Sequence, residues 1–274
     1  MSKLLTSYDF GKTASLACQV DQRFSYCLYV PRTYAQRAQA PRILVAMHDT
    51  GRQNQPLRDL FAEYAESSNT IIIAPLFPGG IIVPGDLENY KYLRFHDIRF
   101  DEVLISMVEE VAARYCVDGS RFSLFGFSGG AHFSHRFLYV HPDRLNTVIV
   151  ASPGSVTLPT AKFQWWAGLQ DFETIFGMPV PWDRIRAVPV HLMVGSKDVN
   201  PKGIVLSSDS PNWIVGADAA GANRLERLRS LFEQLKHSQA QVTFEELADI
   251  GHEVGPIVKA AIRYFGARNH AAYA

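Results

Sequence analysis

The chain has 274 residues, of which 47% are hydrophobic, and its 27 basic side chains are balanced by 27 acidic ones. This balance, with no long basic run, argues against a nucleic-acid partner, and no apolar segment is long enough to span a membrane. We expect one globular domain, residues 1–274, with a large buried core.

The N-terminus and the cysteines indicate a cytoplasmic protein. Residues 1–10 have neither an apolar core after a basic start nor a small-residue cleavage site. Cys18, Cys27 and Cys116 are widely spaced and form no C-x-x-C pair. We expect buried thiols in a reducing compartment, with a Cys18–Cys27 disulfide across an N-terminal hairpin as the alternative.

Strand patterns begin with two alternating segments, residues 16–20 and 24–30, separated by a polar turn. They predict an antiparallel hairpin at a sheet edge. Later strands are predicted by near-continuous apolar runs, which are typical of strands buried on both faces of a parallel sheet. These runs are residues 43–47, 70–74, 122–127, 147–151 and 188–194.

Helical periodicity separates these runs, and Asp97 is the predicted N-cap of the second helix. The helical stripes are residues 57–64, 100–111, 225–235 and 257–265, and a further strand is predicted near residues 242–247. This alternation predicts an α/β fold, a mostly parallel sheet with helices on both faces. Ligands bind such sheets at the carboxyl ends of the strands.

A segment rich in aromatic residues and prolines, residues 155–187, interrupts the alternation and contains three of the four tryptophans. Long loops in compact domains are usually functional. We therefore expect a small lid over an apolar substrate pocket, with Trp165 and Trp166 in its wall. The alternative is a connection whose aromatic side chains join the main core.

The sequence Gly126-Phe127-Ser128-Gly129-Gly130 is a G-x-S-x-G motif between the predicted strand at 122–127 and a predicted helix that begins near Ala131 and stops before Pro142. In this context the serine occupies a strained turn that exposes its hydroxyl, and the glycines allow strand and helix to pass closely. Ser128 is thus a candidate nucleophile, which needs a base to accept its proton. The alternative is a glycine-rich turn with an ordinary serine.

The order serine, acid, histidine supplies the partners of Ser128. Asp198 follows the strand at 188–194, whereas Asp209 and Asp218 lie in an irregular stretch and are weaker candidates. His252 follows the last predicted strand and precedes the last helix. In this arrangement His252 is the general base and acid, and Asp198 orients it.

His132 and His135 share a helix face, a spacing that suits either metal binding or packing. No third ligand at a matching spacing is evident, so we favour a packed or solvated helix face and expect neither a metal nor a cofactor.

With these residues together, the chain resembles an α/β-hydrolase over residues 16–267. More loosely, residues 26–31 and 42–52 are similar to the polyhydroxyalkanoate depolymerase-like and feruloyl-esterase-like branch. The residues that carry the resemblance are 47–51, 126–130, Asp198 and Gly251-His252. The branch usually has His-Gly where this chain has His48-Asp49; aspartate tolerates a left-handed backbone, so the turn can survive.

Two backbone amides are expected to form the oxyanion hole. One is the N–H of Gly129, next after the nucleophile. The resemblance assigns the second to the N–H of Thr50, while the neighbouring amides of that loop remain alternatives.

These expectations combine into a serine hydrolase that cleaves small carboxylic esters through an acyl-enzyme. The substrate is expected to have an apolar or aromatic part. Phe127 and Arg52 are further candidate substrate contacts, and Arg52 either recognises a carboxylate or phosphate or is an exposed arginine without a role. The fold also supports amidases, thioesterases, peptidases and non-enzymatic binding proteins.

Overall fold

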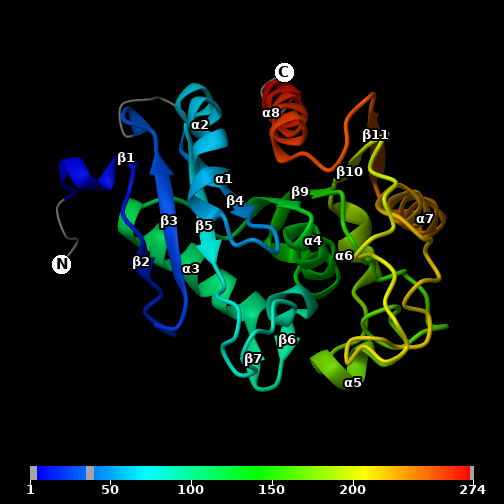
Figure 1. Cartoon of the computed structure of the whole chain (residues 1–274). Coiled ribbons are helices and arrows are strands. Elements are labelled where there is room, and N and C mark those ends of the chain that lie inside the picture. Colours follow the sequence, from blue (N-terminus) through cyan, green and yellow to red (C-terminus); the bar gives the residue numbers. More distant parts are fainter. Residues whose placement is uncertain (1–4, 35–39, 272–274) are drawn as a thin grey trace. The chain divides into compact units, whose positions relative to one another are not determined.

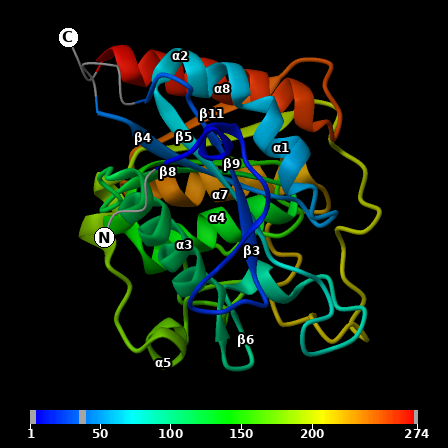
Figure 2. The ribbon, with the colours of Figure 1, turned by 90° about the vertical axis from the view of Figure 1, so that its left-hand side faces the viewer.

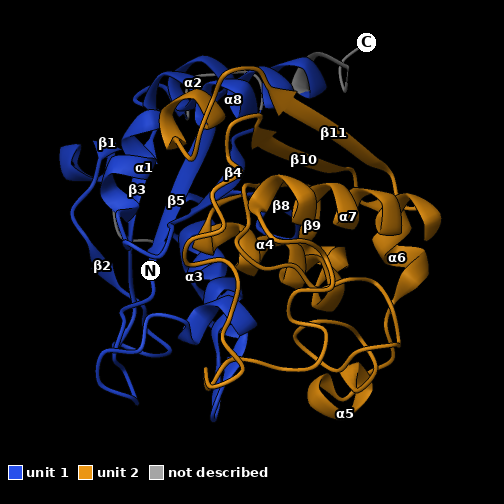
Figure 3. Ribbon diagram, turned by 45° about the vertical axis from the view of Figure 1, so that its right-hand side comes forward, with its two compact units in different colours: residues 1–125, 258–274 blue, residues 126–257 orange. Residues whose placement is uncertain are grey.

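The computed structural model describes residues 5–34 and 40–271 (Figure 1). The chain forms two compact units (Figure 3): Met1–Phe125 with Val258–Ala274, and Gly126–Ile257. Strand β8 (Phe122–Phe127) leads from the first unit into the second, and helix α8 (Val254–Ala271) leads back.

The sheet of the first unit has the strand order β1-β3-β5-β4. Strand β4 pairs with β5 in parallel, with Ile43 opposite Ile71, and β3 pairs with β5 antiparallel. The predicted N-terminal hairpin is confirmed, because β2 and β3 pair antiparallel. The strands are β1 (Gly11–Lys12), β2 (Leu16–Ala17), β3 (Ser25–Val30), β4 (Arg42–Met47) and β5 (Thr70–Leu76), and a separate hairpin joins β6 (Arg94–Phe95) to β7 (Ile98–Arg99).

Helices lie on both faces of this sheet. Figure 2 shows α1, α2 and α8 on one face and α3 on the other. The bounds are α1 (Asn54–Leu60), α2 (Ala62–Ser68) and α3 (Phe100–Tyr115), with short 3-10 helices η1 (Ser7–Asp9) and η3 (Asn89–Tyr92). Tyr64 of α2 packs on Phe265 of α8, with ring centroids 6.0 Å apart.

Two expectations for these helices are wrong in detail. The stripe at 57–64 is two helices, because the backbone breaks at Phe61 (φ −94°, ψ 2°), whose buried ring packs against Phe125. Asp97 is not the cap of α3, since the chain turns back through the β6–β7 hairpin before the helix begins and its N-cap residue is Arg99.

In the second unit, β9, β10 and β11 form a parallel sheet in which Val190 lies opposite Val148 on one side and Val242 on the other. The prediction of buried strands from apolar runs is confirmed for β10, which is buried along its whole length. The elements are α4 (Gly129–Val140), η4 (Pro142–Arg144), β9 (Leu145–Ala151), β10 (Val190–Gly195), α7 (Arg224–His237) and β11 (Val242–Leu247).

The insertion between β9 and β10 contains α5 (Phe172–Phe176) and α6 (Trp182–Ala187). Trp165 packs against Phe172 and Phe176, with ring centroids 6.1 and 4.9 Å apart. The insertion therefore has an aromatic cluster of its own.

All three cysteines are free thiols. Cys18 and Cys27 are buried as expected, and the alternative of a disulfide between them is wrong. Cys116 is exposed, contrary to expectation, because it ends helix α3 in the left-handed conformation (φ 52°). None of the helices in the described ranges has the length and apolar character needed to cross a membrane.

Candidate active site

The strand-to-helix turn at Ser128 has the geometry that exposes a nucleophile. Ser128 has φ 54° and ψ −115°, a conformation that side-chain-bearing residues rarely adopt. A Cβ on Gly126 would overlap the carbonyl group of Gly130 and the hydroxyl of Ser134, so only glycine fits there. The N–H of Ser128 donates to the carbonyl oxygen of Ala151 at 2.9 Å, which ties the turn to the end of β9.

The structure brings Ser128, His252 and Asp198 together within the second unit. His252 Nε2 lies 3.0 Å from Ser128 Oγ, and His252 Nδ1 lies 2.7 Å from Asp198 Oδ2. With Nδ1–H donating to the carboxylate, Nε2 has a free lone pair that can accept the proton of Ser128 Oγ. Asp198 is 2% exposed, whereas Ser128 is half-buried and accessible.

Backbone contacts fix the two loops that carry the acid and the base. The N–H of Lys197 donates to Ile250 O at 2.8 Å, and the N–H of Asp249 donates to Ser196 Oγ at 2.9 Å. Gly195 allows this contact, because a Cβ there would overlap the carbonyl oxygens of Ile250 and Gly251. Sequence reasoning missed Gly195; its position directly after a buried strand, three residues before the acid, was the available signal.

The environment of Asp198 favours its charged form. Burial alone would raise the pKa of Asp198, but the hydrogen bond and electrostatic attraction of the His252 ring, the charge of Arg224 and the hydroxyl of Ser152 together lower it below its usual value. Asp218, one of the alternative acids, instead pairs with Arg227.

Phe127 lies against the base. Its ring stacks on the imidazole of His252, with centroids 4.7 Å apart and planes 25° from parallel. The Phe127 side chain is 4% exposed, and little of it is open to solvent. Its predicted contact with substrate stays a prediction.

The predicted oxyanion donors lie on different units. Gly129 is the first residue of α4, and the N–H groups of a first helical turn have no acceptor within the helix and carry a partial positive charge. Thr50 lies in the first unit, in the loop after β4. Both assignments stay predictions.

The turn beside Thr50 forms without a left-handed aspartate. The Asp49 carboxylate accepts the N–H of Gly51 at 2.8 Å, and Asp49 O accepts the N–H of Arg52 at 3.1 Å. Arg52, with φ 56°, is the residue in the left-handed region. The side-chain hydrogen bond of Asp49 thus helps to close this turn.

Sequence reasoning also missed the groups that brace this loop. His48 is fully buried; its Nδ1–H donates to Asp49 O at 2.7 Å, and its Nε2 accepts the N–H of Phe77 at 3.0 Å. Burial lowers the pKa of His48 to about 3, so its ring is neutral. The hydroxyl of Tyr90 donates to His48 O at 3.0 Å.

The guanidinium of Arg52 donates to carbonyl oxygens of its own unit, including Thr50 O at 2.6 Å and Phe77 O at 3.2 Å. Arg52 is half-buried, and its side chain holds the loop through these hydrogen bonds. The alternative of an exposed arginine without a role is therefore wrong. Its recognition of a substrate anion stays a prediction.

His132 and His135 pack as expected for a structural helix face. His135 Nδ1–H donates to Ala131 O at 2.6 Å, and its Nε2 accepts the N–H of Thr157 at 2.9 Å. His132 Nε2 accepts the N–H of Ser155 at 3.0 Å, and its Nδ1 lies 3.0 Å from Ser155 Oγ. Both nitrogens of each ring are thus engaged in holding the segment after β9.

Comparison with solved structures identifies the fold. A poly(3-hydroxybutyrate) depolymerase from Bordetella parapertussis matches with a TM-score of 0.75 at 22% identity, over 93% of this chain and 90% of its own. A poly(aspartic acid) hydrolase from Sphingomonas sp. KT-1 gives 0.71 at 20% identity, over 88% and 92%. An S-formylglutathione hydrolase from Agrobacterium tumefaciens gives 0.62 at 16% identity, over 97% of both chains. This is the α/β-hydrolase fold. No family model and no curated protein matches the sequence.

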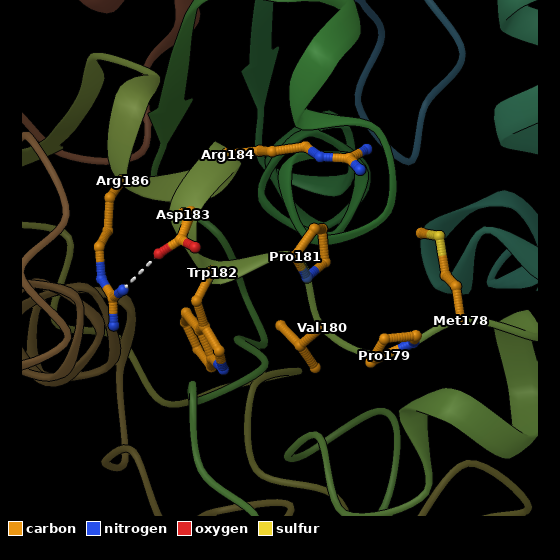
Figure 4. A pocket seen from close by; sticks show the side chains of 8 residues that line it. All are labelled: Met178, Pro179, Val180, Pro181, Trp182, Asp183, Arg184 and Arg186. Atoms are coloured by element: carbon orange, nitrogen blue, oxygen red, sulfur yellow. Dashed lines mark hydrogen bonds and ion pairs between the residues drawn. The ribbon is translucent and has the colours of Figure 1, made fainter.

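Within this α/β-hydrolase fold, the insertion holds the aromatic residues predicted to line a substrate pocket. Trp166 is buried, donates its Nε1–H to Asn212 O at 3.0 Å and lies under the guanidinium of Arg136. A hollow of about 560 Å³ lies farther along the insertion (Figure 4), and neither Trp165 nor Trp166 is among the residues that line it. Its lining residues are Met178, Pro179, Val180, Pro181, Trp182, Asp183, Arg184 and Arg186. The lid and the substrate roles of Trp165 and Trp166 stay predictions.

Proposed function

We propose that this chain is a serine hydrolase that cleaves carboxylic esters through an acyl-enzyme intermediate. The observation that carries the proposal is the continuous hydrogen-bond chain from Ser128 Oγ to His252 Nε2 at 3.0 Å and from His252 Nδ1 to Asp198 Oδ2 at 2.7 Å. This is the arrangement of nucleophile, base and orienting acid that activates a serine hydroxyl.

In the first half of the reaction, the Ser128 proton moves to His252 Nε2 while Oγ bonds to the carbonyl carbon of the ester. The carbonyl oxygen becomes an oxyanion, which the N–H of Gly129 is proposed to bind. The tetrahedral intermediate collapses, and the imidazolium returns the proton to the departing alcohol. Asp198 stabilises the imidazolium throughout.

In the second half, water replaces the alcohol. His252 takes a proton from water, the hydroxide oxygen bonds to the acyl carbon, and the bond to Ser128 Oγ breaks as Oγ regains its proton. The products are a carboxylic acid and the free enzyme. The accessible serine in its strained turn supports both steps.

We propose a small ester with an apolar or aromatic part as the substrate. The aromatic side chains of the insertion support this choice. The neighbours in fold are named as a depolymerase of poly(3-hydroxybutyrate), a hydrolase of poly(aspartic acid) and a hydrolase of S-formylglutathione. Two of these neighbours are thus named as hydrolases and one as a depolymerase.

The test measures labelling by a fluorophosphonate and turnover of p-nitrophenyl esters of increasing acyl length. Wild type should label at one serine and hydrolyse the esters, and Ser128→Ala should do neither. Ser106→Ala, on helix α3 with its hydroxyl bonded to Glu102 O, is the matched control and should behave as wild type. A wild type that binds an apolar ligand but neither labels nor turns over would instead be a binding protein.

A further inference from the structure

Arg224 contacts the acid of the triad from a direction that the mechanism above does not use. It is the first residue of α7, and its Nη1 lies 3.3 Å from Asp198 Oδ1, while Oδ2 of the same carboxylate binds His252. The Arg224 side chain is 16% exposed and that of Asp198 is 1% exposed. The buried carboxylate therefore bridges a guanidinium and the catalytic imidazole.

Helix stability does not explain this arginine. The N-terminus of a helix carries a partial positive charge, so a cation in the first turn is unfavourable there. The start of α7 is already capped by Asn223, whose side chain accepts the N–H of Glu226 at 3.0 Å. Burial also lowers the pKa of Arg224 below its usual value, which shows that its environment opposes the charge, although a guanidinium remains charged at neutral pH.

We propose that Arg224 is a positioning residue that acts through Asp198 and keeps His252 neutral, and therefore able to accept the serine proton, down to lower pH. This proposal rests on the proposed hydrolase function. The cation compensates part of the Asp198 charge, so the carboxylate attracts a proton to the imidazole less strongly. Because the pair is largely shielded from solvent, salt screens this effect weakly.

The other charged groups near this site are two ion pairs and the carboxylate of Glu253. Arg227, one helical turn along α7, is buried and pairs with Asp218. Lys197 and Asp249 pair with each other at 2.8 Å on the exposed side of the loops. Glu253 accepts the N–H of Gly251 at 3.4 Å, and Ser152, beside Asp198, is uncharged.

The test compares the pH dependence of kcat/KM for wild type, Arg224→Met, Arg224→Gln and Arg224→Lys. Removing the charge should move the acidic limb of the profile to higher pH by about one unit in Arg224→Met and Arg224→Gln. Arg224→Lys keeps the charge and should stay close to wild type. Arg229→Met is the control, because it removes a positive charge from the exposed side of the same helix, where Arg229 pairs with Glu246.

The glutamine variant separates charge from structure. Its amide can still donate to Asp198, so an unmoved limb in Arg224→Gln would overturn the charge effect, as would a lysine variant shifted as far as the neutral ones. If Arg224→Met does not fold, as judged by thermal unfolding, the glutamine and lysine pair decides alone. Absence of esterase activity and labelling in wild type would refute the hydrolase proposal itself, which is a distinct result.

Discussion

Gly195 at the end of β10 touches the carbonyl oxygen of Ile250 so closely that a Cβ has no room. This contact joins the strand before Asp198 to the loop before His252. Gly195→Ala should push the loop away and separate the base from the nucleophile. We expect kcat to fall by about 10²-fold, since a misplacement of about 1 Å has that effect, with a stability loss of about 1–3 kcal/mol.

Gly255→Ala is the matched control for this substitution. Gly255 lies in the first turn of α8, and a Cβ there meets no atom within 4 Å. Activity should be unchanged, and stability should rise by up to about 1 kcal/mol from helix propensity. Steady-state kinetics and urea unfolding of both variants check the prediction; full activity in Gly195→Ala would contradict it.

Asp198→Asn tests the assignment of the acid. An amide can hold the imidazole in the wrong tautomer, so turnover of a p-nitrophenyl ester should fall by about 10⁴-fold with the fold intact. Asp209→Asn, on the exposed surface, should leave the rate unchanged. An unchanged rate in Asp198→Asn would return Asp209 and Asp218 to consideration.

The parts predictable from sequence were those set by local pattern. Continuous apolar runs predicted the buried strands, and the turn at Ser128 followed from the glycines on either side of it. Asp198 and His252 were found because each follows a strand, and strand ends gather at one edge of a sheet. The structure places both beside Ser128.

The parts that sequence did not predict depend on contacts between distant segments. Arg224 is 26 residues from Asp198 along the chain, and its helix stripe gave no sign of a buried charge pair. The break at Phe61 is likewise decided by packing against Phe125, because the apolar periodicity is the same for one helix or two. His48 could not be recognised as a brace until Phe77 and Tyr90 lay around it.

Stability should fall in mild acid because of His48. Its pKa is lowered to about 3 in the folded protein, against about 6.5 in an unfolded chain. The unfolded state therefore binds the extra proton as the pH falls below about 6.5, and the folded state does so only near 3. Above pH 6.5 this term is absent, and below it unfolding becomes easier by up to about 1.4 kcal/mol per pH unit.

The measurement is the urea unfolding free energy between pH 7 and pH 4. His48→Gln removes one titrating group and should reduce the slope, to which His135 and His191, whose pKa values burial also lowers, still contribute; the loss of its hydrogen bonds lowers stability at every pH. His237→Gln, exposed at the end of α7, should keep the wild-type slope. Parallel slopes in His48→Gln and wild type would contradict the prediction.

The thiols should differ in reactivity. Cys116 is exposed and should react with Ellman's reagent in the folded protein, whereas Cys18 and Cys27 are buried and should react only in denaturant. Burial also raises the pKa of both buried thiols, which reduces the reactive thiolate. Cys116→Ser should abolish the fast reaction, and its persistence would show that a buried thiol becomes accessible.

The stacking of Phe127 on His252 places the proposed base against the residue that precedes the proposed nucleophile. Phe127 and Ser128 are consecutive residues, so the rigid turn that holds the attacking oxygen also holds the surface on which the imidazole lies. Phe127, a residue that the G-x-S-x-G motif leaves unspecified, thus links the turn of the proposed nucleophile to the proposed base, whose Nε2 lies 3.0 Å from Ser128 Oγ.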